Sequence, residues 1–314
     1  MPHRARLFHR LTSLLAVALL ASMVLNACGA STTIPAASYT PKTGDLPDFS
    51  HIFVIMMENR SYDDIMNGED TPYITQLASQ YGLATKYYAI THPSLPNYIA
   101  TTSGDTQDIT SDCTNCFVDA QNLVDSLEAG GKTWRAYMED MPQPCFVGDA
   151  YPYMQKHNPF IYYDDIRTNP TRCADIVPLT RLSSDIATHA VPDFVWITPN
   201  MCHDMHDCTA SSSDAWLKTI VPQITSSHAW KDNGLLVITW DEGTDNSGCC
   251  QYAAGGHIAT LVISPLVPAG TRSAQPYDHY SLLRTITQAW GLREPGHAAS
   301  AATRPLVDFF GKGQ

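Results

Sequence analysis

An apolar run at residues 51–57, with the sequence HIFVIMM, constrains the fold of this chain more than any other feature. Near-continuous apolar strands are typical of parallel sheets, because helices cover both faces of such a sheet. Further strand-like runs occupy 87–90, 132–138, 194–197, 235–240 and 258–264. Helices are predicted between and after them at 72–81, 95–103, 122–129, 214–230 and 280–290. This alternation predicts an α/β fold: one doubly wound, mostly parallel sheet with helices on both faces.

The first 47 residues differ from the rest of the chain. Arg4, Arg6 and Arg10 precede an apolar run at 14–25, which is typical of a signal peptide and too short for a stable membrane span. The run ends in the sequence LNACG at 25–29, which resembles a bacterial lipobox with Cys28 as the lipid attachment site. We therefore expect a signal peptide at 1–27 and a flexible Ser, Thr, Pro and Ala-rich tether at 28–47. The protein would be exported and anchored to the membrane by lipid, or cleaved near the same position and secreted.

Residues 48–314 are expected to form a single domain, in which 139–180 is an irregular, Pro- and Tyr-rich insertion that shapes the rim of a pocket. Removal of residues 1–27 takes away three of 19 basic side chains and none of the 31 acidic ones, which leaves a net charge of −15. Such a surface excludes nucleic acid as the natural partner. It is compatible with phosphate chemistry, because a metal ion or helix N-termini can supply local positive potential.

Eight of the nine cysteines lie beyond Cys28, and an even number in an exported chain indicates disulfides. Many pairings of these eight are compatible with the sequence, and we expect the adjacent Cys249 and Cys250 to bond to different partners. Cys113-x-x-Cys116 has the spacing of half a zinc site or of a redox motif. Neither is expected, because the sequence has no second pair at zinc-like spacing and no thioredoxin-like context.

Ser94 lies at a predicted strand-to-helix junction, in the sequence THPSLPNYIA at 91–100. The unpaired backbone N–H groups of the first turn of such a helix form a binding site for an anion such as phosphate. A hydroxyl at this point could act as a nucleophile. Alternatively Ser94 only caps the helix, since Ser is a favoured N-cap and Pro a favoured neighbour.

Polar side chains follow four of the predicted strands. Glu58 and Asn59 come after the first strand, the loop 200–207 with its histidines follows 194–197, and Asp241 and Glu242 follow 235–240. Because the carboxyl ends of parallel strands meet at one edge of a sheet, these groups and Ser94 are expected to converge there. Each alone would fit a solvated turn or an exposed loop, but clustered acids repel one another unless a cation offsets their charge.

The sequence therefore predicts one divalent metal ion at this edge. Such an ion would favour the alkoxide form of the serine and activate a hydroxyl that is otherwise a poor nucleophile. Because the donors are almost all oxygen atoms, Ca²⁺, Mg²⁺ or Mn²⁺ is favoured over zinc. The expected ligands are Glu58, Asn59, Ser94, Asp241 and Glu242.

Five motifs in this order resemble the bacterial phosphoesterase family, which groups secreted acid phosphatases with phospholipases C inside the alkaline phosphatase superfamily. The likeness runs from about residue 51 to 292 and is nearest to short secreted acid phosphatases, including ones that act on phosphatidylinositol 3-phosphate. The motifs are ENRSYD at 58–63, HPSLPNY at 92–98, NMCHDMHD at 200–207 with DAWL at 214–217, WDEG at 240–243 and DHYS at 278–281.

The resemblance implies that Ser94 is the nucleophile of a phosphoserine intermediate and that the metal lies beside it. His206, with His203 or His257, would bind phosphoryl oxygens or protonate the leaving alcohol; His257 follows two glycines and is alternatively a turn histidine. The alkaline phosphatases proper have an Asp-His pair where Asp241 and Glu242 stand, so their two-zinc arrangement is not expected. The remaining residues expected to bind substrate are His92, Asn97 and Asp207.

The expected function is a metal-dependent phosphomonoesterase that works outside the cytoplasm on a small phosphorylated substrate or a phospholipid head group. A phosphodiesterase of the phospholipase C type would use the same residues, although phospholipases of the family carry a longer C-terminal part. A lipoprotein that binds phosphorylated ligands without turnover is the alternative of another class. The retention of Ser94 together with all four other oxygen ligands disfavours it.

Overall fold

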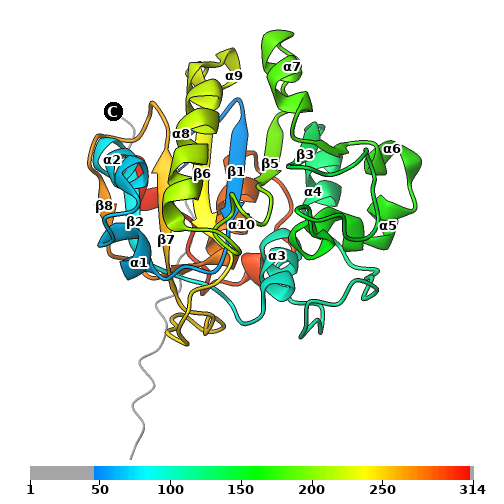
Figure 1. Cartoon of the computed structure of the whole chain (residues 1–314), viewed down its shortest axis with the longest axis horizontal. Helices are drawn as coiled ribbons and strands as arrows, with labels where there is room; N and C mark the ends of the chain where they lie inside the picture. Colours follow the sequence, from blue (N-terminus) through cyan, green and yellow to red (C-terminus); the bar gives the residue numbers. More distant parts are fainter. Residues whose placement is uncertain (1–45, 312–314) are drawn as a thin grey trace, which may run out of the picture. The chain divides into compact units, whose positions relative to one another are not determined.

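The computed structural model describes residues 46–311, so the predicted signal peptide, Cys28 and nearly all of the tether lie outside the described residues. Within that range the chain forms one nine-stranded sheet with the order β4-β3-β5-β1-β6-β7-β2-β8, and β9 pairs with β2 (Figure 1). The strands are β1 (Ile52–Met57), β2 (Gly82–Tyr88), β3 (Trp134–Met138), β4 (Ile176–Pro178), β5 (Phe194–Thr198), β6 (Leu235–Trp240), β7 (His257–Ile263), β8 (Arg272–Ser273) and β9 (Tyr277–Asp278).

Strand β1 is the centre of the sheet, as its apolar sequence predicts. It pairs in parallel with β5 and β6, with Ile52 opposite Phe194 on one side and Leu235 on the other. All six of its residues are completely buried. The prediction of a doubly wound, mostly parallel sheet is confirmed.

Strand β7 is the exception, because it runs antiparallel to both β6 and β2. The connection from β6 to β7 contains no helix, whereas a parallel return requires a crossover, usually through one. Two antiparallel pairings restore the original direction, so β2 points the same way as β6. The ends of β1, β2, β5 and β6 therefore lie at one edge of the sheet.

The helices form two groups that cover the two faces. One group contains α2 (Pro72–Gln80), which contacts α1 (Tyr62–Met66) and α8 (Ala210–Ser226), and α8 also contacts α7 (Arg181–Ala187). The other contains α10 (His279–Ala289), which contacts α3 (Ser94–Ser103) and α4 (Leu123–Ala129). Figure 1 shows α8 in front of the strands and α10 behind them. The predicted helix at 214–230 is in fact two, because α8 ends at Ser226 and α9 (His228–Lys231) follows.

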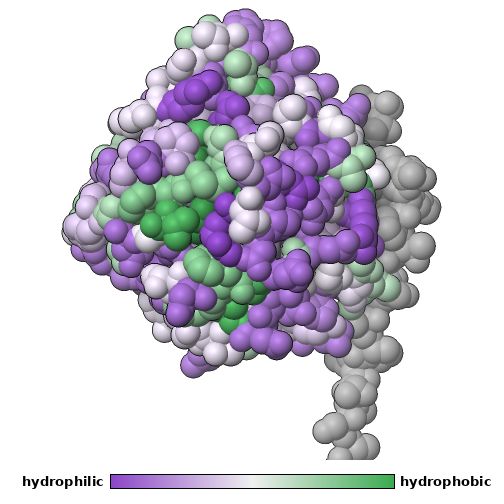
Figure 2. All heavy atoms as spheres, turned by 90° about the vertical axis from the view of Figure 1, so that its right-hand side faces the viewer, coloured by the Kyte–Doolittle hydropathy of each residue, from purple (hydrophilic) through white to green (hydrophobic). Residues whose placement is uncertain are grey.

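The segment 139–180 is more regular than expected. It contains the 3₁₀ helices η1 (Gln155–His157) and η2 (Pro159–Tyr162) and the short helices α5 (Asp164–Arg167) and α6 (Pro170–Cys173). It ends in β4, which adds an edge strand to the sheet beside β3. The face on which α5 and α6 lie is mostly hydrophilic with apolar patches between (Figure 2).

Four disulfides join the eight described cysteines. They are Cys113–Cys116, Cys145–Cys173, Cys202–Cys208 and Cys249–Cys250. The prediction that Cys249 and Cys250 have different partners is wrong, since these neighbours bond to each other and the other six cysteines form the three remaining pairs. No helix among residues 46–311 is long and apolar enough to cross a membrane.

Candidate active site

Ser94 is the first residue of α3 and is almost completely buried, with 1% of its surface exposed. Its Oγ donates a hydrogen bond to Glu58 Oε2 at 3.0 Å and lies 3.4 Å from Glu242 Oε1. The helix is capped by Pro93, and no side chain caps it through a hydrogen bond. The alternative that Ser94 serves as the N-cap is therefore wrong: its hydroxyl points toward carboxylates from the ends of β1 and β6.

The side chain of Asn97 fixes the turn that presents Ser94. Its Oδ1 accepts the backbone N–H groups of Ile90 and Thr91, both at 3.0 Å, and its Nδ2 donates to the carbonyls of Thr91 and Pro93. The amide is thus fully engaged by the backbone. In this arrangement the side chain of Asn97 holds the turn before Ser94, and the substrate contact expected from sequence stays a prediction.

Glu58 is completely buried at the end of β1. It accepts a hydrogen bond from the hydroxyl of Tyr98, and its Oε1 lies 3.2 Å from Nε2 of His157. Burial raises the pKa of Glu58 well above its usual value, and the charges of Asp241 and Asp204 raise it further. A carboxylate in this environment gains free energy by binding a proton or a cation.

Asp241 is also completely buried and completes the acidic cluster. Its Oδ1 accepts the backbone N–H of Asn59 at 3.1 Å, while its Oδ2 accepts no hydrogen bond from the described residues. Burial and the charge of Glu242 raise the pKa of Asp241 well above its usual value. The backbone carbonyl of Asp241 is held by Nε2 of His279 at 2.7 Å, so α10 contributes to its position.

Glu242 and His92 form a contact pair beside Ser94. His92 Nδ1 contacts Glu242 Oε2, and His92 Nε2 lies 3.0 Å from the carbonyl of Asp245. Burial raises the pKa of Glu242, and the contact with His92 partly opposes that rise. His92, expected at the substrate, is thus placed where it orients Glu242.

The predicted histidines separate into two sets. His206 lies in the loop after β5, with Nδ1 2.7 Å from Asp207 Oδ1 and Nε2 3.3 Å from Nζ of Lys156. His203 instead contacts Glu139 at 2.9 Å and stacks on Trp216.

His257 is held away from these groups by its own contacts. Its Nε2 lies 3.0 Å from the carbonyl of Thr85, and its ring stacks between Tyr62 and Tyr88. Of the three predicted histidines, His206 is the one that joins a chain of polar contacts leading to Ser94.

Sequence reasoning missed a second group around the serine. His157 is buried between two acids, with Nδ1 3.2 Å from Asp204 Oδ2 as well as Nε2 near Glu58. Burial raises the pKa of Asp204 to about 7 and lowers that of His157 well below its usual value. Lys156 precedes His157 and donates to Asp112 Oδ2 at 2.9 Å. Asp204 lay within a motif that we singled out, but no periodicity or spacing in 139–180 marks the other two.

The oxygen donors around Ser94 are of the kind that hard divalent cations prefer. Among residues 46–311 no three His, Cys, Asp or Glu side chains form a ready-made metal-binding group. Nevertheless two buried carboxylates face the Ser94 hydroxyl, and a third has a buried oxygen without a hydrogen bond. Burying unpaired anionic oxygens is costly unless a cation is present, so this set fits a cation in chemical terms.

The sequence of the chain is similar to those of known phosphoesterases. The model of the Phosphoesterase family matches residues 66–293. The chain is 31% identical to an acid phosphatase of Aspergillus fumigatus over 79% of this chain and 56% of that protein. It is also 31% identical to a phosphatidylinositol-3-phosphatase of Mycobacterium tuberculosis, over 85% of this chain and 84% of that one.

A solved structure of a protein in the alkaline phosphatase superfamily, from Vibrio parahaemolyticus, has a TM-score of 0.57 at 14% identity. It covers 87% of this chain and 75% of that one. This likeness shows the fold alone. The chain spans less than two thirds of the length of the first fungal relatives that it matches.

Proposed function

Because this chain belongs to the phosphoesterase family, we propose that it is an extracytoplasmic, metal-dependent phosphomonoesterase that works through a phosphoserine on Ser94. The observation that carries the proposal is the buried Ser94 hydroxyl, which lies at the N-terminus of α3 between Glu58 and Glu242. The printed names of two relatives, an acid phosphatase and a phosphatidylinositol-3-phosphatase, support it. Its substrates would be small phosphate esters or a phosphorylated lipid head group.

In the proposed reaction Ser94 Oγ attacks phosphorus in line while its proton passes to Glu58, which accepts the hydrogen bond of the hydroxyl. The new Oγ–P bond forms, and the bond to the leaving alcohol breaks. His206, oriented through Nδ1 by Asp207, gives a proton to the leaving oxygen. Water then attacks the phosphoserine and gives a proton to His206. The Oγ–P bond breaks, Ser94 Oγ regains its proton from Glu58, and inorganic phosphate is released. At the N-terminus of α3 the backbone N–H of Ser94 would favour the charge that develops on the phosphoryl oxygens, since the N–H of Leu95 is accepted by Asp112 and Pro96 has none.

Glu58, Asn59, Asp241 and Glu242 would hold the metal ion together with Ser94 Oγ. When bound, the ion would lower the pKa of the Ser94 hydroxyl and neutralise charge on the phosphoryl group. The other residues prepare the site. Tyr98 and His157 orient Glu58, His92 orients Glu242, and the amide of Asn97 fixes the turn before α3.

The test is hydrolysis of an aryl phosphate monoester and the matching bis-aryl diester by wild type and Ser94→Ala, with and without chelator. We expect monoester cleavage that falls by at least about a thousandfold in Ser94→Ala and is lost on chelation. Ser103→Ala is the matched control, since Ser103 is an equally buried serine at the other end of α3 that bonds to the carbonyl of Ile99. Cleavage of the diester alone would replace the proposal by a phospholipase C-type activity. Cleavage of neither by metal-supplied wild type would favour a binding protein.

A readout independent of activity tests the metal. Added Ca²⁺, Mg²⁺ or Mn²⁺ should raise the melting temperature of the wild type by mass action, and by much less in Asp241→Asn. An equal rise in both proteins would contradict the ligand set.

Export and lipid attachment through Cys28 are part of the same proposal. Four disulfides support an oxidising compartment. Cys28→Ser should move the protein from the membrane fraction to the soluble fraction of cells. Retention in the membrane fraction would contradict lipid anchoring.

A further inference from the structure

Lys156 is a largely buried cation next to the N-terminus of α3. Its Nζ donates to Asp112 Oδ2 at 2.9 Å, and the other oxygen of Asp112 accepts the backbone N–H of Leu95 at 3.0 Å. Leu95 directly follows Ser94, so one carboxylate links the ammonium group to the first turn of the nucleophile helix. Only 14% of the Lys156 side chain is exposed, which shows that it is held in this position.

The neighbours of Lys156 place it on the side of the site that faces His206. Its Nζ lies 3.3 Å from His206 Nε2, and the next residue, His157, lies 3.2 Å from the carboxylate that accepts the Ser94 hydroxyl. Residues 156–157 therefore contact His206, assigned above to the leaving oxygen, and Glu58, which accepts the hydrogen bond of the nucleophile. An ammonium group has three N–H donors. Asp112 accepts one of them and His206 Nε2 can accept a second when it carries no proton, so the contacts within residues 46–311 leave at least one donor for a substrate oxygen.

The electrostatic setting gives this lysine a specific role. Glu58, Asp241, Asp204 and Glu242 make the surroundings of Ser94 strongly acidic. The charge of a single metal ion would mainly neutralise those carboxylates. A phosphate monoester at neutral pH carries close to two negative charges, because its second pKa is about 6. A second cation would therefore favour binding of the dianion among these acids, and would favour a diester less because it carries one charge only.

We propose that Lys156, positioned by Asp112, binds a nonbridging oxygen of the substrate's phosphoryl group and makes the site prefer monoesters to diesters. The inference rests on the proposed function above and deepens it. Asp112 is a positioning residue, because it holds the ammonium group and the N-terminus of α3 at a fixed separation. The diester loses less when Lys156 is removed, because its reacting group has half the charge and one of its oxygens is blocked by the second ester.

The test compares kcat/KM of metal-supplied wild type and Lys156→Gln for an aryl phosphate and its bis-aryl diester. We expect a loss of about 10²–10³-fold for the monoester, as for the removal of one preorganised donor, and less than tenfold for the diester. Lys156→Arg should recover part of the monoester activity. The inhibition constant for inorganic phosphate should rise at least tenfold in Lys156→Gln. Lys132→Gln is the matched control, because Lys132 pairs with Asp193 and lies over Trp290, away from the site.

Two results would overturn the inference. They are equal losses for the two esters and an unchanged affinity for inorganic phosphate. If the melting temperature of Lys156→Gln shows that the fold is lost, Asp112→Asn decides, since it keeps an acceptor for Leu95 N–H and weakens only the hold on Lys156. It should lower the ratio of monoester to diester kcat/KM, and an unchanged ratio rejects the inference.

Failure of the proposed function is distinguishable from failure of this inference. If wild type cleaves neither ester, the proposed function fails. Calorimetric titration of wild type and Lys156→Gln with inorganic phosphate then still decides whether Lys156 binds a phosphate group.

Discussion

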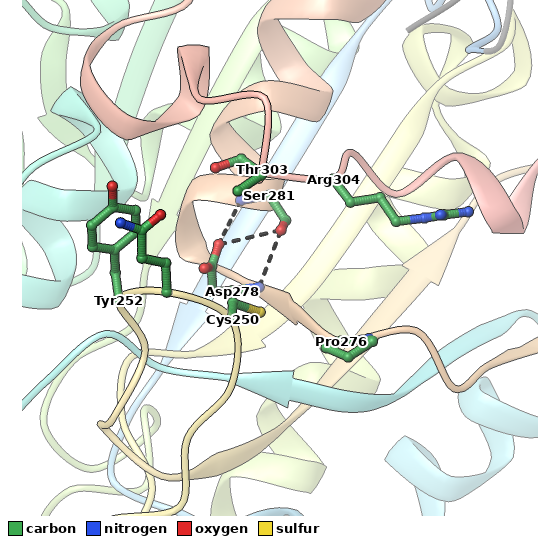
Figure 3. Close-up of a pocket in the computed structure, with 9 residues that line it drawn as sticks. Cys250, Tyr252, Pro276, Asp278, Ser281, Thr303 and Arg304 are labelled. Atoms are coloured by element: carbon green, nitrogen blue, oxygen red, sulfur yellow. Dashed lines mark hydrogen bonds between the residues drawn. The ribbon is translucent and has the colours of Figure 1, made fainter. Parts of the chain in front are cut away.

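Replacing Asp278 by Asn is expected to stabilise the protein at pH 8 and to change its stability little at pH 4. Asp278 is the N-cap of α10, and its Oδ1 accepts the backbone N–H of Ser281 at 2.9 Å and the Ser281 hydroxyl at 3.2 Å (Figure 3). Burial raises the pKa of Asp278 from 3.8 to about 6, although hydrogen bonds from Ser281 and Tyr280 oppose the rise. The folded protein therefore binds a proton at this carboxylate more strongly than the unfolded chain does.

The magnitude follows from the shift. A pKa raised by about two units costs about 3 kcal/mol of unfolding free energy wherever the group is ionised in both states. As pH rises from 4 to 6, the Asp278 carboxyl group loses its proton in the unfolded chain before it does so in the folded protein. The free energy of unfolding of the wild type therefore falls across that interval. The full cost is present above pH 6 and absent below the unfolded pKa.

Asn keeps the Oδ1 acceptor but turns an NH₂ group toward the backbone N–H of Tyr280, which costs about 1 kcal/mol. The net gain should be about 2 kcal/mol at pH 8 and close to zero at pH 4.

Urea unfolding followed by tryptophan fluorescence, with the disulfides intact, measures this difference at the two pH values. Asp278→Ala is the control, because it removes the charge and the cap together and should be less stable than Asp278→Asn by about 1 kcal/mol. Activity should persist in Asp278→Asn, since α10 still holds the carbonyl of Asp241 through His279. A gain of the same size at pH 4 and pH 8, or a loss at pH 8, would refute the claim that the buried charge is the destabilising factor.

Three further predictions concern the packing around the site. Tyr98→Phe should lower the free energy of unfolding by about 1–3 kcal/mol at pH 8, because the buried carboxylate of Glu58 loses a hydroxyl donor. Urea unfolding measures this difference, and a difference within experimental error contradicts the prediction. Replacing Cys145 and Cys173 together by Ser should lower the free energy of unfolding by about 3–4 kcal/mol from loop entropy alone. The midpoint of urea unfolding reports this loss, and an unchanged midpoint contradicts the entropy account. Ile55→Ala, in the completely buried centre of β1, should cost about 2–5 kcal/mol by the same measurement, and a loss below about 1 kcal/mol would mean that the cavity collapses.

The fold and half of the site were predictable because both depend on local sequence. A completely apolar strand such as 52–57 is expected at the centre of an α/β sheet, where helices cover both of its faces. Polar residues that end parallel strands meet at one edge of the sheet. Glu58, Ser94 and Glu242 follow from those two rules. Strand β7 did not follow from them, because strand direction depends on whether the intervening loop crosses the sheet, which an apolar pattern does not show.

The rest of the site could not be predicted, because it depends on how an irregular segment returns to the sheet. Nothing in the sequence around Lys156 and His157 has the period of a helix or strand, and their neighbours Asp112 and Glu58 are 44 and 99 positions away. His203 and His206 show the same limit on a smaller scale. They are three residues apart in one disulfide-closed loop, yet one faces Glu139 and the other Lys156.

The segment 139–180 therefore contributes side chains to the charged group around Ser94. Its end is fixed by β4, which pairs with β3, and its beginning is tied to α6 by the disulfide Cys145–Cys173. Between these attachments η1 delivers Lys156 and His157, whose contacts with Asp112, Glu58 and Asp204 reach both sides of the nucleophile. Because the two histidine contacts involve completely buried carboxylates, they form only if the segment docks correctly. The docking of the segment and the assembly of the charged site thus depend on each other, and the almost complete burial of Phe160, Tyr162 and Tyr163 holds the segment against the rest of the fold.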